Sequence, residues 1–489
     1  MKPQDRLFIN GRYVEALGNK RIEVLNPATN ETLAEVHRAE EKDFERAIDA
    51  AHTIQGEWGQ MTPWQRSAAL HRVGDAIERN LEFLAQLETD DVGKPIFESR
   101  NVDIASGAAT FHYFADACMA LGGEVKPSPY NEVLDYTVRE PLGVVGAIIP
   151  WNFPFLIACR KIATALAAGN TMVIKPASWA PMSTLQLGQI FSEADVPPGV
   201  LNICPSSGSD AGKALAGSPM VEELSFTGST QIGRLLYSGC CDPIKGITLE
   251  LGGKSPGLVL PDCDLDETIA GTLFGAFLNQ GECCCALTRL VVHEDIYDTF
   301  VPRFVEASRG IRVGMPREDD TRMGPMVHPD QLKSVMDLVQ SGQDEGATLL
   351  CGGEILRDGA LAKGNFMSPA VFADVKSGMR IWREEIFGPV VVITRAADVE
   401  DMVAQANDTN YGLAASVWTT NLKAAHTLAR RIDAGTVWFN LHNFVFPSAP
   451  YAGYKESGLG SELGIEGLRA MTRVKNVMVS LFPNGFQWY

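Results

Sequence analysis

Apolar positions recur at helical spacing through the first quarter of the chain. Across 40–101, and again across 104–119, they return every three to four residues, for example at Leu70, Val73 and Ile77. This spacing places the apolar side chains on one face of a helix. The pattern therefore predicts a helical N-terminal region.

The pattern changes near residue 144, where short apolar runs begin to alternate with segments of helical spacing. A second alternating series starts near 255, with a strand expected at 257–260 and a helix at 268–278, and it continues to about 449. Alternation of this kind is typical of parallel sheets with crossover helices, so we predict two α/β lobes. The apolar runs of the first series lie at 144–149, 171–174, 200–203, 221–225 and 246–251.

Two further segments, 130–138 and 476–481, alternate apolar and polar residues and predict strands with one face in solvent. With 489 residues the chain is too long for one ordinary core, and two or three domains are expected. The sequence contains no internal repeat and no low-complexity segment.

Composition argues against a membrane or nucleic-acid partner. Hydrophobic residues make up 45% of the chain, yet no apolar run reaches the roughly 18 to 20 residues of a membrane helix. The formal charge of −18 disfavours attraction to nucleic acid or anionic membrane. The first residues resemble neither a secretory signal nor a transit peptide, and ten cysteines without regular spacing suit a reducing compartment. We expect a soluble, cytoplasmic protein with free thiols.

Two motifs carry the candidate chemistry. Residues 250–256 read Glu-Leu-Gly-Gly-Lys-Ser-Pro, and residues 279–286 contain three successive cysteines. A thiolate can add to an aldehyde carbonyl, and the adduct can then lose hydride to an acceptor on its other face. A carboxylate can activate the water that releases the acid. Glu250 and a thiol are therefore a candidate base and nucleophile, although most cysteines are simply small buried hydrophobes.

These motifs and several others, in this order along the chain, resemble the aldehyde dehydrogenase superfamily, in its NAD(P)-dependent hydrolytic branch. The resemblance runs almost end to end and implies oxidation of a small-molecule aldehyde to the acid with NAD or NADP. The other motifs are 26–29 (Asn-Pro-Ala-Thr), 150–154 (Pro-Trp-Asn-Phe-Pro), 175–178 (Lys-Pro-Ala-Ser), 226–233 (Phe-Thr-Gly-Ser-Thr-Gln-Ile-Gly), 384–389 (Glu-Glu-Ile-Phe-Gly-Pro) and 453–458 (Gly-Tyr-Lys-Glu-Ser-Gly).

The resemblance also implies the architecture. We expect an α/β fold with a Rossmann-like NAD(P)-binding domain, an α/β catalytic domain and a small β oligomerisation extension. Relatives pair such extensions into a sheet between subunits, so a homodimer or homotetramer is expected. The expected boundaries are 1–122 with 142–252 for the NAD(P)-binding domain, 253–452 for the catalytic domain, and 123–141 with 453–489 for the extension.

Segment 226–233 follows an apolar run and opens a helix. Gly228 permits a tight turn there, and Ser229 begins a helix N-terminus that can face phosphate. The segment lacks Gly-x-Gly-x-x-Gly, so by itself it could equally be a structural turn. The resemblance assigns these residues to the cofactor: Trp151, Lys175, Ser178, Gly208, Phe226, Ser229, Leu251, Glu385 and Phe387.

Position 178 departs from NAD-selective relatives, which usually carry Glu there to hold the ribose hydroxyls. Ser178 removes the carboxylate that would repel a 2′-phosphate and can itself donate to one. We expect NADP to be accepted, while the bulky neighbour Trp179 leaves the preference open. By resemblance, Lys175 reaches the adenine ribose, and Glu385 with Phe387 holds the nicotinamide ribose and ring.

The resemblance implies that Cys284 is the nucleophile, that Asn152 and the backbone N–H of Cys284 bind the oxyanion, and that Glu250 is the base. Lys161 and Glu462 match a pair that relays protons from this base in relatives. A Lys–Glu ion pair would serve structure equally well, so that role stays open.

Glu282 stands where relatives usually have Gln. An inward carboxylate could raise the pKa of the nucleophile, whereas one that faces solvent would have no effect. We expect the carboxylate to face solvent. Cys283 and Cys285 are expected to be packing residues, and a disulfide to Cys284 would need strained geometry. No metal site is expected, on the argument that consecutive side chains diverge rather than converge on one ion.

Arg160 is the clearest guide to the substrate. Relatives acting on aliphatic or betaine aldehydes commonly carry Trp at this position, whereas those acting on semialdehydes and lactaldehyde often carry Arg. A guanidinium there would attract a carboxylate or a hydroxyl, unless it pairs with a structural carboxylate. Phe153, Phe444 and Phe446 are the other expected substrate contacts, and Phe444, Phe446 and His442 could instead frame an aromatic aldehyde. A noncatalytic homologue used as a binding or structural protein is the alternative from another class.

Overall fold

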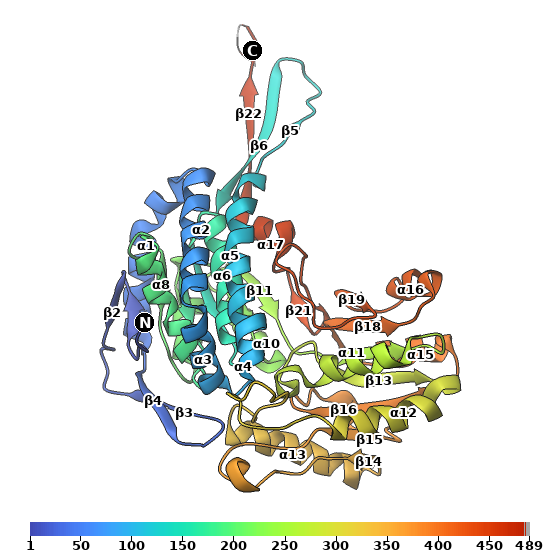
Figure 1. Ribbon diagram of the computed structural model, residues 1–489. Coiled ribbons are helices and arrows are strands. Elements are labelled where there is room, and N and C mark those ends of the chain that lie inside the picture. The colour runs from blue at the N-terminus through green and yellow to red at the C-terminus, as the bar shows by residue number, and fades with distance from the viewer. Residues whose placement is uncertain (484, 486–489) are drawn as a thin grey trace.

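Two large, mostly parallel sheets form the body of the protein, as seen in the computed structural model (Figure 1). The structure describes residues 1–483 and 485. The first sheet has eight strands, in the spatial order β2 (Arg12–Val14), β1 (Leu7–Ile9), β9 (Leu201–Ile203), β8 (Thr171–Lys175), β7 (Val144–Ile148), β10 (Val221–Thr227), β11 (Gly246–Glu250) and β21 (Gly458–Leu459). The strands from β9 to β11 run parallel, and the other three join antiparallel at the edges.

Helices cover both faces of this sheet because successive strand residues point to opposite sides. Helix α1 (Glu41–Gln60) packs on the face that carries Val173. Helix α6 (Pro154–Ala167) packs on the face that carries Met172. Further helices lie outside α6, among them α2 (Pro63–Arg79), α3 (Leu81–Val92) and α5 (Ala105–Ala117) (Figure 1). These helices are the helical N-terminal region that the sequence predicts.

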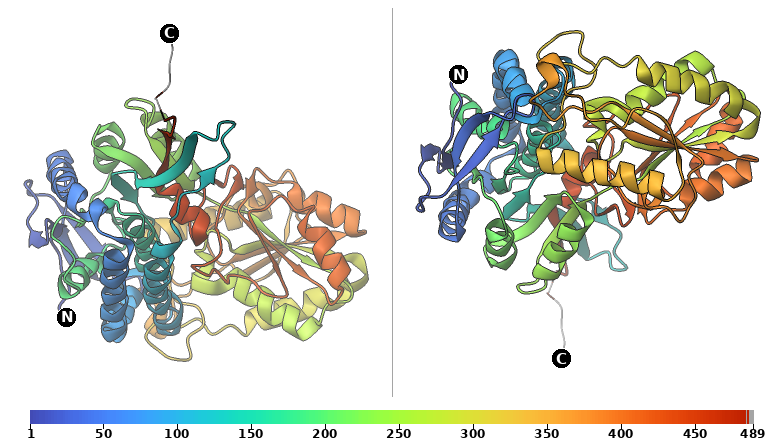
Figure 2. Two further views of the ribbon diagram at one scale, coloured as in Figure 1. Left: turned by 90° about the horizontal axis from the view of Figure 1, so that it is seen from above. Right: turned by 90° about the horizontal axis from the view of Figure 1, so that it is seen from below.

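The second sheet lies beside the first and is also flanked by helices (Figure 2). Helices α11 (Leu265–Phe277) and α12 (Glu294–Arg309) pack on one face, and α13 (Pro329–Asp344) packs on the other. Its seven strands are, in order, β14 (Thr348–Cys351), β15 (Ala370–Ala373), β16 (Val390–Ala396), β13 (Leu287–His293), β12 (Ser255–Val259), β18 (Ala414–Trp418) and β19 (Thr436–Phe439). All neighbouring pairs except β14 with β15 are parallel.

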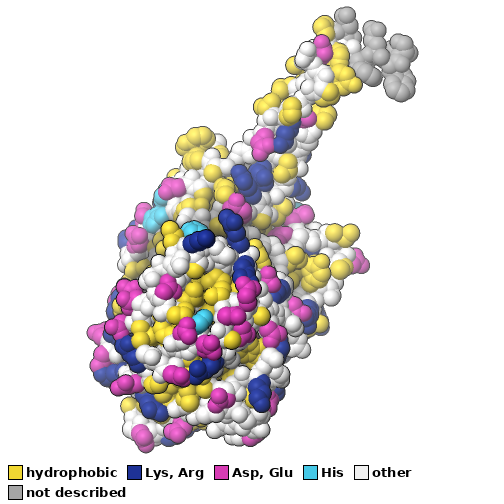
Figure 3. All heavy atoms as spheres, turned by 90° about the vertical axis from the view of Figure 1, so that its right-hand side faces the viewer, with side chains coloured by type: hydrophobic (Ala, Val, Ile, Leu, Met, Phe, Trp, Pro, Cys, Tyr) yellow, Lys and Arg dark blue, Asp and Glu magenta, His cyan; other side chains and the backbone are white. Residues whose placement is uncertain are grey.

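A three-stranded sheet projects from the body as an arm (Figure 1). It consists of β22 (Thr472–Ser480), β6 (Val133–Pro141) and β5 (Val125–Lys126), paired antiparallel in that order. Strand β22 is an edge strand of nine residues. Hydrophobic side chains lie along the arm (Figure 3), and Val125 and Met478 are among those that are exposed.

The predicted α/β fold with parallel sheets is confirmed, and the five apolar runs of the first series are β7, β8, β9, β10 and β11. The helix expected at 268–278 begins earlier, at Leu265, because the Asp264 side chain caps it by accepting hydrogen bonds from Asp266 N and Glu267 N. Among the described residues, no helix has both the length and the apolar character needed to cross a membrane.

Candidate active site

The three cysteines lie on a turn that leads into β13. Asn279 and Gln280, just before them, adopt left-handed backbone angles with φ of 49° and 57°. The N–H of Ala286 donates to the carbonyl of Cys283 over 3.1 Å and closes the turn. As a result, the three thiol sulfurs lie within 4.8 Å of one another. The expectation that consecutive cysteine side chains diverge is therefore wrong, because it holds for an extended strand and not for a tight turn.

Cys284 differs from its neighbours in what it faces. Its side chain is partly exposed and borders two cavities, whereas Cys283 and Cys285 are buried, as expected of packing residues, and border one of the two. Contact with the Cys283 thiol lowers the pKa of Cys284, but contact with Cys285 and burial outweigh it and raise that pKa to about 12. The Cys284 thiol is thus protonated at neutral pH, and a base must remove its proton before it can attack.

Asn152 is tied to the thiol turn by hydrogen bonds. Its Nδ2 donates to the carbonyl of Glu282 over 3.0 Å. The Nδ2 of Asn279 donates to the carbonyl of Asn152 over 2.8 Å and to that of Glu282 over 3.1 Å. Within the described chain, the second amide hydrogen of Asn152 and the backbone N–H of Cys284 have no acceptor. Two donors are therefore free beside the thiol, which is the requirement for an oxyanion site.

The prediction for the Glu282 side chain is wrong. Its carboxylate is buried rather than solvent-facing, and its Oε1 accepts a hydrogen bond from Val327 N over 3.2 Å. Burial raises the pKa of Glu282 well above its usual value, because it disfavours the charged form. Its backbone carbonyl, not its carboxylate, takes part in the site through the bonds from Asn152 and Asn279.

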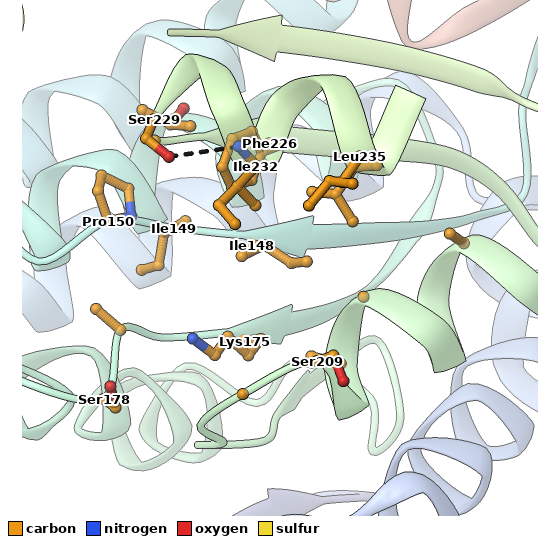
Figure 4. A pocket seen from close by; sticks show the side chains of 18 of the residues that line it. Ile148, Ile149, Pro150, Lys175, Ser178, Ser209, Phe226, Ser229, Ile232 and Leu235 are labelled. Carbon is orange, nitrogen blue, oxygen red and sulfur yellow. Dashed lines mark hydrogen bonds between the residues drawn. The ribbon is translucent and has the colours of Figure 1, made fainter. Parts of the chain in front are cut away.

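A cavity of about 910 Å³ lies between β8 and α10 (Thr230–Gly239). Figure 4 shows Lys175 and Ser178 on one side of it and the side chains of α10 on the other. The Ser229 side chain caps α10 by accepting a hydrogen bond from Ile232 N over 3.4 Å, so the helix N-terminus borders the cavity. Six predicted cofactor residues line this cavity: Trp151, Lys175, Ser178, Gly208, Phe226 and Ser229.

The lining of this cavity fits a dinucleotide. A helix N-terminus binds phosphate, and α10 presents one. The Lys175 ammonium has no partner among the described residues, and burial lowers its pKa to about 8. Ile232 and Leu235 are 44% and 64% exposed and form an apolar wall suited to a flat base. Trp179 also lines the cavity, and its ring stacks on His328 with centroids 4.5 Å apart.

A second cavity of about 230 Å³ continues the first toward the thiol and shares Trp151 and Ser229 with it. Glu385 accepts a hydrogen bond from Gly253 N over 2.9 Å, and burial raises its pKa to about 7. The Phe387 ring meets that of Trp151 edge to face, with centroids 5.2 Å apart. The other predicted residues that line it are Leu251, Asn152 and Cys284.

A third cavity, of about 320 Å³, meets the second at Cys284. Arg160, Phe153, Phe444 and Phe446 all line it. In the described part of the chain, the Arg160 guanidinium forms no ion pair and no hydrogen bond, so the interpretation of a structural ion pair finds no partner. A cation that lacks a partner beside a thiol is available to a bound anion or hydroxyl.

His442 has a different place from the one considered for an aromatic substrate. It is 1% exposed, and its Nε2 lies 2.7 Å from the carbonyl oxygen of Cys285. Burial lowers the pKa of His442 to about 4, so the ring is neutral and Nε2 donates to that carbonyl. His442 therefore holds the thiol turn from behind and is not a cavity wall.

Glu250 ends β11, where both of its carboxylate oxygens are buried without a hydrogen-bond partner among the described residues. Burial, followed by the charge of Glu462, raises the pKa of Glu250 well above its usual value. Lys161 donates to Glu462 and, over 2.8 Å, to the hydroxyl of Ser225. The structure thus brings the predicted Lys161–Glu462 pair together, and its charges act on Glu250.

Sequence reasoning missed three contributions to the site. Asn279 was seen only as part of a motif, although Asn before a turn is a signal for the left-handed backbone it adopts. Ile232 and Leu235 have the spacing of a core-facing helix stripe, and no sequence signal shows that this stripe faces a cavity. His442 gives no signal of its contact with the thiol turn.

Comparison with known proteins shows the family of the chain. The sequence profile of the aldehyde dehydrogenase family matches residues 13–477. The chain is 40% identical to Retinaldehyde dehydrogenase 3 of Homo sapiens over 480 residues, 97% of this chain and 93% of that protein. The NAD+ complex of an aldehyde dehydrogenase from Bacillus cereus superposes with a TM-score of 0.95 at 41% identity, covering 98% of this chain and 96% of that one. An NADP-dependent enzyme from E. coli gives a TM-score of 0.95 at 33% identity, covering 98% of each chain.

Two mostly parallel α/β sheets, a cavity of about 910 Å³ bordered by a helix N-terminus, and a thiol on the smaller cavity that continues it fit an NAD(P)-dependent oxidoreductase. The chain belongs to the aldehyde dehydrogenase family. It oxidises aldehydes with NAD(P), as the resemblance of its motifs implies.

Proposed function

We propose that this enzyme oxidises a small polar or anionic aldehyde, of semialdehyde or lactaldehyde type, to the carboxylic acid. The unpaired Arg160 guanidinium in the 320 Å³ cavity beside Cys284 carries this proposal. Taking a cation out of water is costly, and a substrate carboxylate or hydroxyl would repay that cost by pairing with it. Aromatic or aliphatic aldehydes are the second candidate, because Phe444 and Phe446 expose half or more of their surface at the same cavity.

In this proposal the reaction runs on five side chains. Glu250 takes the proton of the Cys284 thiol and passes it toward Lys161 and Glu462. The Cys284 sulfur then adds to the aldehyde carbon, and the oxyanion accepts hydrogen bonds from the Asn152 amide and the Cys284 N–H. When bound, NAD(P)+ supplies the acceptor for the hydride that leaves this adduct. The Glu250 carboxylate then takes a proton from water, which attacks the thioester and frees the thiol. Lys161 and Glu462 pass that proton toward solvent.

The cofactor roles follow the shape of the two connected cavities. We assign the pyrophosphate to the N-terminus of α10 at Ser229 and the adenine ribose to Lys175. Glu385 would accept hydrogen bonds from the ribose hydroxyls at the nicotinamide end, in place of the hydrogen bond that it now accepts from Gly253 N. No carboxylate stands at Ser178, which leaves room for a 2′-phosphate, and both NAD and NADP are therefore proposed cofactors.

The three-part division of the chain, with NAD(P)-binding, catalytic and oligomerisation segments, is likewise proposed. The projecting arm supports a homodimer or homotetramer, since a nine-residue edge strand with exposed apolar side chains is a surface for pairing with a second copy. Strand β21 lies in the segment assigned to oligomerisation yet joins the eight-stranded sheet, so that segment also contributes to the body. Ten free cysteines support a reducing compartment such as the cytoplasm.

The test compares initial rates of NAD(P)H formation for wild type and Arg160→Ala. The substrates are succinate semialdehyde, lactaldehyde, an uncharged aliphatic aldehyde, betaine aldehyde and benzaldehyde, each with NAD and with NADP. We expect the anionic or hydroxylated aldehydes to have the highest kcat/KM and to lose that advantage in the variant. If benzaldehyde or the aliphatic aldehyde is best in both proteins, the substrate proposal is wrong while the cysteine mechanism stands.

A further inference from the structure

The three thiols at the end of the substrate cavity can act together as well as singly. We propose that Cys283, Cys284 and Cys285, the thiol triad, bind one soft divalent cation with a filled d shell, such as Zn²⁺ or Cd²⁺. When the cation is bound, it coordinates the Cys284 sulfur, which can then no longer add to an aldehyde. This inference goes beyond the proposed substrate and does not depend on it.

The positions of the sulfurs carry the proposal. All three lie within 4.8 Å of one another, and the Cys283 and Cys285 sulfurs are already 3.5 Å apart. A tetrahedral zinc thiolate site, with bonds of about 2.3 Å, places its sulfurs roughly 3.8 Å apart. Rotation of the partly exposed Cys284 side chain would therefore complete three corners of the tetrahedron. The fourth corner points to the cavity, where water can bind.

The charges around the thiol triad favour the loaded state. Three thiolates on a dication leave one net negative charge, and the unpaired Arg160 guanidinium borders the same cavity. The 320 Å³ cavity gives an ion a path from solvent to all three sulfurs.

The binding step balances without any redox partner. Three sulfur–metal bonds form, the cation gives up water molecules, and the protons still held by the thiols pass to solvent. No electrons are transferred, so the site stays chemically distinct from a disulfide. Removing the cation with a chelator returns the thiols and the activity.

The test titrates reduced, metal-free, full-length enzyme with Cd²⁺ and follows the ultraviolet sulfur-to-cadmium charge-transfer absorbance. We expect one Cd²⁺ per subunit with the intensity of three thiolates. Cys283→Ser and Cys285→Ser should each lose about a third of that intensity and weaken binding roughly tenfold or more, because one ligand is lost. Cys241→Ser is the matched control, since its thiol is exposed and lies outside the thiol triad. It should bind as wild type does.

The proposal is overturned if Cys283→Ser and Cys285→Ser bind Cd²⁺ like wild type while Cys284→Ser does not. That result would mean that Cys284 alone binds the cation. It is also overturned if the wild-type absorbance corresponds to one thiolate. Circular dichroism checks that each variant folds, and Cys285→Ala replaces the serine variant if a buried hydroxyl unfolds the turn. The readout uses no aldehyde, so its failure is distinct from a failure of the substrate proposal.

Discussion

Replacing Asn279 by alanine tests whether the Asn279 side chain positions the Asn152 amide beside the turn that carries the three thiols. The change removes three buried hydrogen bonds: Nδ2 donates over 2.8 Å to the Asn152 carbonyl and over 3.1 Å to that of Glu282, and Oδ1 accepts from Gln280 Nε2 over 3.3 Å. Each such bond contributes about 0.5–1.5 kcal/mol. Alanine at a left-handed φ of 49° adds about 1–2 kcal/mol of strain. The free energy of unfolding should therefore fall by about 2.5–6.5 kcal/mol.

The effect on catalysis should be separable from the effect on stability. Loss of an oxyanion donor costs about 10²–10³ in kcat, and here Asn152 keeps its amide but loses one anchor, so we expect a smaller fall of roughly tenfold or more. The assay measures kcat and KM for Asn279→Ala, Asn152→Ala and the double variant, with urea unfolding in parallel. In the double variant the losses in kcat should not add, because both single changes act on the same amide.

A matched control is Asn10→Ala, which removes an exposed asparagine at a similar φ of 51° far from the site. It should lower stability through backbone strain and leave kcat unchanged. The reasoning is refuted if Asn279→Ala keeps the wild-type kcat, or if its loss adds in full to that of Asn152→Ala.

Four further predictions concern the site and the arm. Ser178→Glu should lower kcat/KM for NADP roughly tenfold or more and spare NAD, since a carboxylate beside the adenine ribose would repel a 2′-phosphate. Equal losses for both cofactors would contradict this prediction. The pKa values of Glu250 and Cys284 are raised, so both groups are protonated at low pH, and kcat should rise with pH above neutrality. The variant Glu250→Gln should form one NAD(P)H per subunit in a burst and then stop. A steady rate in this variant would exclude Glu250 as the base. Met478→Asp, on the arm, should shift the enzyme to a smaller species in size-exclusion chromatography, and an unchanged elution volume would remove the arm from the proposed interface.

The fold could be predicted from the sequence because the patterns that indicate its strands and helices are local. The runs that became β7 to β11 are short, apolar and separated by helical periodicity, and β7 and β8 are buried on both faces. The edge strands β1, β2 and β21 were not predicted, since edge pairing depends on which sheet they meet and leaves little trace in two or three residues. The start of α11 was misplaced because a single cap at Asp264 outweighed the apolar pattern.

The sequence by itself determined the chemical groups, namely a thiol run, the Glu250 carboxylate, an amide at Asn152 and a cation at Arg160, together with the family whose motifs they match. The tertiary structure alone decided the direction in which these side chains point and what they contact. The inward carboxylate of Glu282 and the converging thiols depend on a tight turn and on contacts between residues far apart in the sequence, such as Asn152 with Glu282 and Val327 with Glu282. Hydrophobic periodicity depends only on residues close together in the sequence. The direction of a side chain at a turn depends on tertiary packing, which periodicity does not contain.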